Sequence, residues 1–119
     1  MMRARLKPVL PSLREKKRYM VFEIISKSKF DFRPVSDAIM QSSLQLLGQL
    51  GVAKAGIIPL ENKWNKEISR GIIKVGHKHV DELRASLLLA SKINNEYVII
   101  KSVGVSGIIK KAENNYLKR

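Results

Sequence analysis

The sequence predicts an α/β fold, in which two helices cover one face of a four-stranded antiparallel sheet. The expected elements follow the order strand, helix, strand, strand, helix, strand. Apolar residues alternate with a period of two in the expected strands and recur at helical spacing in the expected helices. The middle two strands can form a hairpin and each helix then makes a crossover, which is the split βαβ plan.

The first strand and the first helix are expected before Gly51. Apolar residues stand at every second position in the first part of 19–26, as in a strand with a buried face. Asp31 and Pro34 suit a helix start, because aspartate can accept a hydrogen bond from a first-turn amide and proline fits the first turn. Apolar residues then recur close to one helical face as far as about Leu50, and Gly51 supplies a C-terminal stop.

Two further strands are expected on either side of a polar loop. Residues 55–60 form a short strand, and Pro59 places it at a sheet edge because proline cannot donate to a ladder. Residues 68–75 form the next strand. The loop between them carries Trp64, the only tryptophan. Trp64 is either an interface anchor or a side chain that packs back on the sheet, and the sequence leaves both interpretations open.

The second helix and the fourth strand complete the order. Asp81 and Glu82 suit the positively polarised start of a helix. Asn94 and Asn95 indicate a turn. Residues 97–103 have the composition of the fourth strand, and a short final helix is expected after them.

This order is typical of ferredoxin-like sandwiches, which include the RRM-like domains. We expect the sandwich over residues 18–104, a basic N-terminal arm over 1–17 and a helical extension of the same domain over 105–119. Hydrophobic residues are 45% of the 119, which excludes disorder as the overall description. No apolar run approaches the roughly 20 residues of a membrane span, and no apolar segment follows the first basic residues as in a signal peptide. We therefore expect a cytoplasmic protein with no membrane partner.

The side chains of the predicted sheet divide between two faces, with the first and third strands in the centre. One set is apolar enough to lie under the helices: Met20, Phe22, Ile24, Ile73, Val75, Val98 and Ile100. The other set mixes aliphatic and charged side chains: Tyr19, Val21, Glu23, Arg70, Ile72, Lys74, Tyr97, Ile99 and Lys101. An RRM that reads sequence stacks bases on aromatic rings at the centre of this second face. Its central positions carry no rings here, so we expect the N-terminal arm, the C-terminal helix or another protein to cover part of it.

Charge is the strongest indication of function. The chain has 23 Lys and Arg against 10 Asp and Glu, a net charge of +13 and a pI near 10.3. Nucleic acid is the usual partner of such a domain, because each neutralised phosphate releases a counterion. A membrane surface and a generally basic proteome in a high-salt cytoplasm are the alternatives. The side chains predicted to contact RNA are Arg3, Arg5, Lys7, Arg14, Lys16, Lys17, Arg18, Arg70, Lys74, Lys78, His79, Arg84, Lys110 and Lys111.

No pattern indicates catalysis by the polypeptide itself. The chain has no cysteine, which excludes thiol chemistry and zinc fingers. His77 and His79 form an HxH pair, but no third metal ligand is evident nearby. The acidic residues are scattered, whereas a two-metal nuclease needs clustered carboxylates. We therefore predict no catalytic residue, no metal site and no cofactor bound by the protein.

Three stretches resemble a known family. They are LPSLREKKRYMVFEI at residues 10–24, RGIIKVGHKHVDELRASLLL at 70–89 and VGVSGIIKKAENNYL at 103–117. All three are similar to archaeal ribonuclease P protein component 2, whose eukaryotic relatives are subunits of ribonuclease P and of the mitochondrial RNA-processing ribonuclease. The resemblance covers nearly the whole chain. One departure is Ile108, where the family usually has threonine.

The resemblance implies an RRM-like sandwich without the aromatic RNA-binding strand. It implies pairing with protein component 3, a TIM-barrel-like subunit, and the pair is expected to support the catalytic domain of the ribonuclease P RNA. The other protein subunits of the holoenzyme are further partners that the resemblance implies. The holoenzyme cleaves the 5′ leader from precursor tRNA, and the RNA carries the active-site Mg²⁺ ions. The protein is then expected to reduce phosphate repulsion and the magnesium requirement.

Two other functions stay open from the residues alone. A protein–protein adaptor with an incidental basic surface would bind component 3 without salt-dependent RNA binding. A general RNA chaperone or ribosomal-type protein would bind many RNAs equally. The exposed aliphatic residues also leave open a homodimer, or a heterotetramer of two copies with two partner chains.

Overall fold

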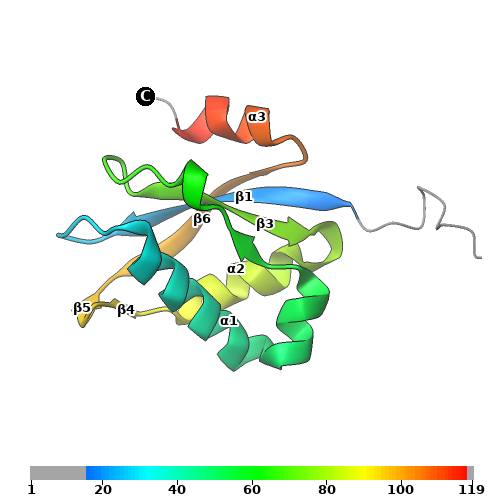
Figure 1. The fold of residues 1–119 in the computed structure, drawn as a ribbon, viewed down its shortest axis with the longest axis horizontal. Coiled ribbons are helices and arrows are strands. Elements are labelled where there is room, and N and C mark those ends of the chain that lie inside the picture. The colour runs from blue at the N-terminus through cyan, green and yellow to red at the C-terminus, as the bar shows by residue number, and fades with distance from the viewer. Residues whose placement is uncertain (1–15, 118–119) are drawn as a thin grey trace, which may run out of the picture.

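The computed structural model describes residues 16–117 (Figure 1). Its main sheet has four antiparallel strands in the order β2-β3-β1-β6. Their bounds are β1 Lys17–Ile25, β2 Ile58–Pro59, β3 Arg70–Gly76 and β6 Ile99–Ser106. The helices are α1 Phe32–Ala55, α2 Val80–Leu89 and α3 Ile109–Ala112, with a π-helical turn at Glu113–Leu117 after α3. Two short strands, β4 Lys92–Ile93 and β5 Glu96–Tyr97, form a separate hairpin.

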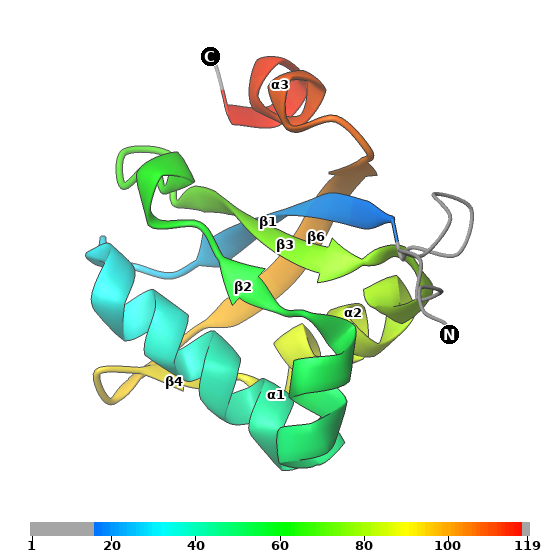
Figure 2. The same ribbon diagram turned by 45° about the vertical axis from the view of Figure 1, so that its right-hand side comes forward.

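Helices α1 and α2 lie on one face of the sheet, and α3 lies on the opposite face (Figure 1 and Figure 2). This arrangement confirms the predicted ferredoxin-like sandwich, with β1 and β3 in the centre. In the β1–β3 register, Tyr19 pairs with Lys74 and Met20 pairs with Ile73. Successive side chains of β1 therefore point alternately toward α3 and toward the two longer helices.

The main core lies between the sheet and helices α1 and α2. All the strand residues predicted for this face belong to it: Met20, Phe22, Ile24, Ile73, Val75, Val98 and Ile100. The helices add side chains that are fully buried, including Val35, Ile39, Leu83 and Leu87. Burial of one such side chain stabilises a fold by about 1.5 to 3 kcal/mol relative to exposure. The period-two assignment of the strands is thus confirmed in the part of the molecule that contributes most to stability.

Helix α1 extends further than the sequence predicted. It ends at Ala55 instead of about Leu50, and Gly51 lies inside it. The C-cap is Gly56, which has a left-handed φ of 66°. Gly48, with φ 76° and ψ 172°, is non-helical, and a kink there divides α1 into two helical segments. The predicted end was wrong because the left-handed residue that closes the last turn is Gly56.

The start of α1 agrees with the prediction in position but not in contacts. Asp31 occupies the N-cap position and Pro34 lies in the first turn. The Asp31 side chain makes no capping hydrogen bond, and its Oδ1 accepts instead from the Nζ of Lys66 at 2.9 Å.

Within the described residues, no helix, α1 included, is long and apolar enough to cross a membrane.

The outer strands differ in extent from the predicted ones. Strand β2 is shorter than expected, because α1 continues to Ala55 with Gly56 as its C-cap, and the strand therefore begins at Ile58. Its last residue is Pro59, which has no amide to donate. The fourth strand of the sheet begins at Ile99 and continues past the predicted end, while Tyr97 belongs to β5. Asn94 and Asn95 have φ values of 52° and 68°, and they form the predicted turn, here between β4 and β5.

Candidate nucleic-acid interface

Residues 109–117, here called the C-terminal strap, cover the sheet face opposite α1 and α2. Gly104 on β6 permits their close approach, because a Cβ at this position would overlap the ring of Tyr116. A second, smaller core lies under the strap, and its members are Val21, Ile72, Ala112 and Leu117, with Tyr19, Leu60, Val103, Ile109 and Tyr116 packed against them. The prediction that part of this face is covered is confirmed, and the C-terminal helix covers it.

Two charged side chains of the sheet and its loop hold the strap. Nη1 of Arg70 donates to the main-chain oxygen of Tyr116 at 2.9 Å. Nζ of Lys63 forms an ion pair with Oε2 of Glu113 at 2.5 Å. The last carbonyls of a helical segment lack partners within the segment, so Arg70 supplies one of the missing donors. The surface that an RRM offers to bases is therefore part of the core in this protein.

Trp64 packs back on the sheet. Its ring stacks on Phe22 with centroids 5.8 Å apart and an interplanar angle of 13°. Its Nε1 donates to the carbonyl of Phe30 at 3.0 Å. Both the apolar ring and the polar N–H are thus used inside the chain, which favours the packing interpretation over the interface anchor.

The Lys and Arg side chains of the described residues divide into two groups by their contacts. The members of one group have a carboxylate partner, in the pairs Lys63–Glu113, Lys66–Asp31, Arg70–Glu23, Arg84–Asp81 and Lys101–Glu23. A cation beside a carboxylate attracts a phosphate less than an isolated cation does, because the two fields oppose each other. This group is therefore less suited to binding nucleic acid.

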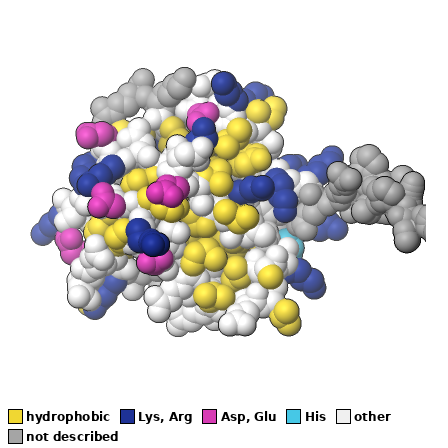
Figure 3. Space-filling model, viewed as in Figure 1, with side chains coloured by type: hydrophobic (Ala, Val, Ile, Leu, Met, Phe, Trp, Pro, Cys, Tyr) yellow, Lys and Arg dark blue, Asp and Glu magenta, His cyan; other side chains and the backbone are white. Residues whose placement is uncertain are grey.

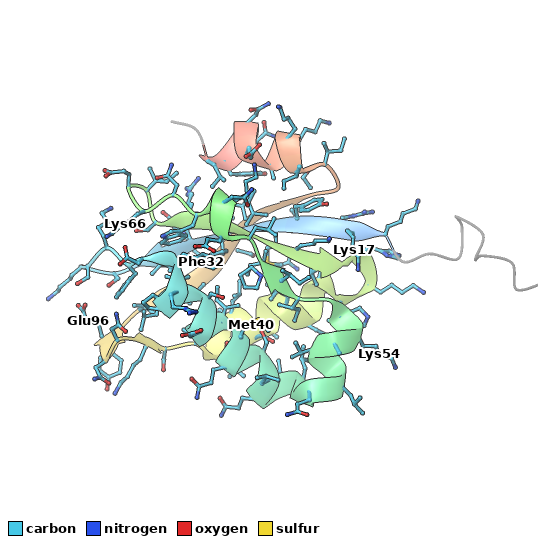
Figure 4. The ribbon with its side chains drawn as sticks, viewed as in Figure 1. Lys17, Phe32, Met40, Lys54, Lys66 and Glu96 are labelled. Atoms are coloured by element: carbon cyan, nitrogen blue, oxygen red, sulfur yellow. The ribbon has the colours of Figure 1, made fainter. Side chains whose placement is uncertain are left out.

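The other group has no carboxylate partner among the described residues, and five of its members gather at one end of the sheet, which we call the basic edge: Lys16, Lys17, Arg18, Lys54 and Lys78. The rest of this group lies elsewhere in the sequence: Lys27, Lys29, Arg33, Lys74, Lys92, Lys110 and Lys111. Figure 4 shows Lys17 and Lys54 at this end, and Figure 3 shows Lys and Arg side chains gathered on the same side of the molecule. None of the five forms an ion pair with a carboxylate of residues 16–117. Their charge is available to an external anion.

Backbone pairing brings the segments of the basic edge together. Lys17 pairs with Gly76 across β1 and β3, and the amide of His77 donates to the carbonyl of Lys16 at 2.7 Å. The Nζ of Lys17 lies 3.2 Å from the position that a Cβ on Gly56 would take. The start of β1 therefore reaches the C-terminal end of α1, where the helix dipole favours positive charge.

The sequence and the fold are similar to those of known proteins. The sequence profile of the Rpp14/Pop5 family matches residues 18–117. The chain belongs to this family. Ribonuclease P protein component 2 of Pyrococcus furiosus is 40% identical over 118 residues, which cover 99% of this chain and 97% of the relative. The proteins of the same name from Thermococcus gammatolerans and Methanosarcina mazei are 40% and 35% identical, covering 98% and 95% of this chain and 95% and 94% of the relatives.

A solved structure shares the fold of this Rpp14/Pop5 chain. A chain in the cryo-EM structure of yeast ribonuclease MRP superposes with a TM-score of 0.60 and 13% identity, covering 85% of this chain and 78% of that one. Similarity at this identity shows the fold alone. The family match itself includes the sandwich and the whole C-terminal strap.

The Rpp14/Pop5 fold brings some of the predicted RNA-binding residues together. The basic edge contains four of them, namely Lys16, Lys17, Arg18 and Lys78. Lys74 lies nearby on β3, opposite Tyr19. Lys110 and Lys111 are exposed on α3. The remaining arm residues, Arg3, Arg5, Lys7 and Arg14, lie outside the residues that the structure describes.

Three of the predicted residues have partners inside the chain. The guanidinium of Arg70 is half-buried between the strap and Glu23, with Nη2 3.7 Å from Oε1 of Glu23. Nδ1 of His79 lies 2.7 Å from a carboxylate oxygen of Glu82. Nη1 of Arg84 donates to Asp81 at 2.7 Å. Contact with RNA stays a prediction for these three, and their intramolecular contacts make them less available than the basic edge.

Lys54 was not among the predicted residues. It reaches the basic edge because α1 continues past Gly51 to Ala55. A signal was present in the sequence, since lysine is typical of the last turn of a helix and Lys54 stands two residues before Gly56.

The two histidines of the HxH pair contact different groups. Nδ1 of His77 lies 3.2 Å from the carbonyl oxygen of Lys16, while His79 contacts Glu82. Across residues 16–117, no group of three or more histidine and acidic side chains is arranged to hold a metal ion.

Proposed function

We propose that this chain is the component 2 subunit of ribonuclease P, the endoribonuclease that removes the 5′ leader from precursor tRNA. One observation supports this most strongly. Archaeal proteins named ribonuclease P protein component 2 are 35% to 40% identical over nearly their full length and nearly the full length of this chain. In this proposal the RNA carries out catalysis and holds the Mg²⁺ ions, and the polypeptide is a supporting subunit.

The basic edge gives the chain a physical means of supporting an RNA. Lys16, Lys17, Lys54 and Lys78 are exposed, and none has a carboxylate partner among the described residues. Such cations release counterions when they meet phosphates and reduce the repulsion between neighbouring RNA segments. The catalytic domain of the ribonuclease P RNA would then fold at a lower magnesium concentration.

The helical layer gives the chain a surface for a protein partner. Its exposed leucines are Leu44, Leu46, Leu50, Leu88 and Leu89. Leu50 is 86% exposed and Leu88 is 71% exposed, which leaves large apolar side chains of both helices open to a partner. In the proposal component 3 covers this surface, the other subunits and precursor tRNA complete the complex, and the complex acts in the cytoplasm.

The test is precursor-tRNA cleavage by the cognate ribonuclease P RNA at limiting Mg²⁺, with this chain and component 3 added singly and together. Rescue by the pair alone is the expected result. Equal rescue by an unrelated basic protein would favour a general RNA chaperone. Absence of rescue, or cleavage without the RNA, would contradict the proposal.

A further inference from the structure

We infer that the basic edge binds the phosphate backbone of double-helical RNA and does not bind the bases of an unpaired strand. The inference rests on the proposed function, in which RNA is the ligand, and it specifies the form of the RNA. Proteins hold unpaired strands largely by stacking bases on exposed aromatic rings. They hold A-form helices by contacts with phosphates and 2′-hydroxyls across the shallow minor groove. The positions of the rings and of the cations therefore distinguish the two modes.

The aromatic side chains of the chain are almost all used inside the fold. The sequence has one Trp, three Tyr and three Phe. The buried or half-buried rings are Tyr19, Phe22, Phe30, Phe32, Trp64 and Tyr116. Trp64 stacks on Phe22, while Tyr19 and Tyr116 pack in the core under the strap. None of these six rings is fully exposed, and Phe32, which borders a surface pocket at the start of α1, lies away from Lys17 and the basic edge (Figure 4).

Tyr97 is the exposed ring, at 78%. It lies in β5 next to Glu96, and Figure 4 shows Glu96 at the opposite end of the molecule from Lys17. The ring is already engaged by Lys92, whose Nζ lies 4.8 Å from the ring centroid in a cation–π contact.

Two rings lie beside the basic edge: Tyr19 is half-buried against the core under the strap, and the imidazole of His77 lies with Nδ1 3.2 Å from the carbonyl oxygen of Lys16. No fully exposed Phe, Tyr or Trp ring of the described residues is placed there to stack a base.

The sheet itself offers no alternative platform for bases. Val21 and Ile72, at the centre of the face, have no exposed surface beneath the strap. Both side chains are aliphatic, so displacement of the strap would uncover no ring at these central positions. Binding to bases on the sheet would also cost the buried area that the strap now covers.

The cations of the basic edge lie on both sides of the end of the sheet. The Nζ of Lys17 approaches Gly56 at the end of α1. The guanidinium of the next residue, Arg18, lies 3.5 Å from the position that a Cβ on Gly107 would take, just beyond the end of β6. Lys17 and Arg18 point to opposite faces of the sheet, because successive side chains along β1 alternate between the two faces. Positive charge on both sides of the end of the sheet can face the two rows of phosphates that border the minor groove of an A-form helix.

The experiment compares the binding of the full chain to three labelled ligands by fluorescence anisotropy. They are an RNA duplex, an oligouridine with the same number of phosphates, and a DNA duplex of the same sequence. We expect the RNA duplex to bind about tenfold or more tightly than the oligouridine at the same salt concentration, because no fully exposed Phe, Tyr or Trp ring lies beside the basic edge to stack unpaired bases. Equal or tighter binding of the oligouridine would overturn the inference.

Substitutions locate the binding. The variant Lys16→Gln/Lys17→Gln/Lys78→Gln should reduce the slope of log affinity against log salt by about 0.9 for each lysine that contacts a phosphate. The matched control Lys27→Gln/Lys29→Gln/Arg33→Gln removes the same charge from exposed positions away from the basic edge and should change the slope less. Equal slopes for the two variants would place duplex binding elsewhere. Both variants change exposed side chains, and their thermal unfolding would be measured alongside binding.

The binding experiment and the cleavage experiment can fail independently of each other. If the chain supports precursor-tRNA cleavage but prefers oligouridine, the inferred form of the RNA is wrong and the subunit role stands. If it prefers the RNA duplex but never supports cleavage, the inference about the ligand stands and the subunit role fails.

Discussion

The guanidinium of Arg70 donates a hydrogen bond to the main-chain oxygen of Tyr116 at 2.9 Å, across 46 positions of sequence. Arg70 is the first residue of β3, one of the two central strands. In the sequence it starts a basic-Gly-hydrophobic run like the RNA-binding strand of an RRM. In the fold it holds the C-terminal strap over that same strand. A residue that pattern alone assigned to RNA is thus used to close the sheet face.

We expect Arg70→Ala to lower the free energy of unfolding by about 1 to 3 kcal/mol, because a hydrogen bond from a charged donor is lost and Glu23 loses a partner. Amide hydrogen exchange in residues 109–117 should accelerate more than in α1. The control is Lys74→Ala on the same strand, because Lys74 forms no ion pair with a described residue; it should change stability by less than about 0.5 kcal/mol. Equal urea midpoints for the two variants would show that Arg70 does not hold the strap.

Gly104→Ala tests the close contact between β6 and the strap. The new Cβ would overlap the ring of Tyr116, and forced displacement of a packed side chain costs about 1 to 3 kcal/mol. Adding Tyr116→Ala should recover part of that loss in thermal unfolding, although it also removes packing of its own. Gly107→Ala is the matched control, because a Cβ there would meet only the guanidinium of Arg18 at 3.5 Å or more. If the Gly104→Ala protein is as stable as the control, the C-terminal strap does not pack against Gly104 as described.

Trp64→Phe separates packing from partner binding. Phenylalanine keeps a ring against Phe22 but removes the hydrogen bond from Nε1 to the Phe30 carbonyl. We expect a loss of about 0.5 to 1.5 kcal/mol in the free energy of unfolding. The affinity for component 3, measured by titration calorimetry, should not change. Unchanged stability with weakened binding would restore the interface-anchor interpretation.

Leu50→Lys/Leu88→Lys tests the proposed surface for component 3. Both leucines are largely exposed, so the stability of the free chain should change little. Burial of two new charges in the interface should weaken binding to component 3 by about tenfold or more. Ile108→Lys is the control, since Ile108 is also exposed, at 56%, but lies beside the strap. Equal weakening by both variants would mean that component 3 does not recognise the helical layer.

The sheet could be predicted from the sequence because alternation is a local property. The period of two predicted that Met20 and Ile73 lie under the helices. In the structure these two residues pair across β1 and β3, and both belong to the main core. The end of α1 was not predictable in the same way, since Gly48, Gly51 and Gly56 all lie near it. Only the packed fold decides which glycine takes the left-handed position that ends the helix.

The sequence predicted most residues of the candidate site, but it did not predict which of the basic residues lie together. Arg18 and Arg70 look alike as basic residues at strand starts. Yet Arg70 has Glu23 and the Tyr116 carbonyl as partners, while Arg18 has only the neighbouring Lys17 carbonyl among the described residues. Such partners come from segments distant in sequence. The separation of paired from unpaired cations therefore needed the three-dimensional structure.

The central claim is that the unpaired cations of the basic edge support the RNA. The most direct test is the rate of precursor-tRNA cleavage against Mg²⁺ concentration, in holoenzyme reconstituted with Lys16→Gln/Lys17→Gln/Lys78→Gln or with the control Lys27→Gln/Lys29→Gln/Arg33→Gln. The account predicts that the basic-edge variant needs more Mg²⁺ for half-maximal rate, while the control follows the unmodified protein. Identical Mg²⁺ curves for the two variants would contradict it.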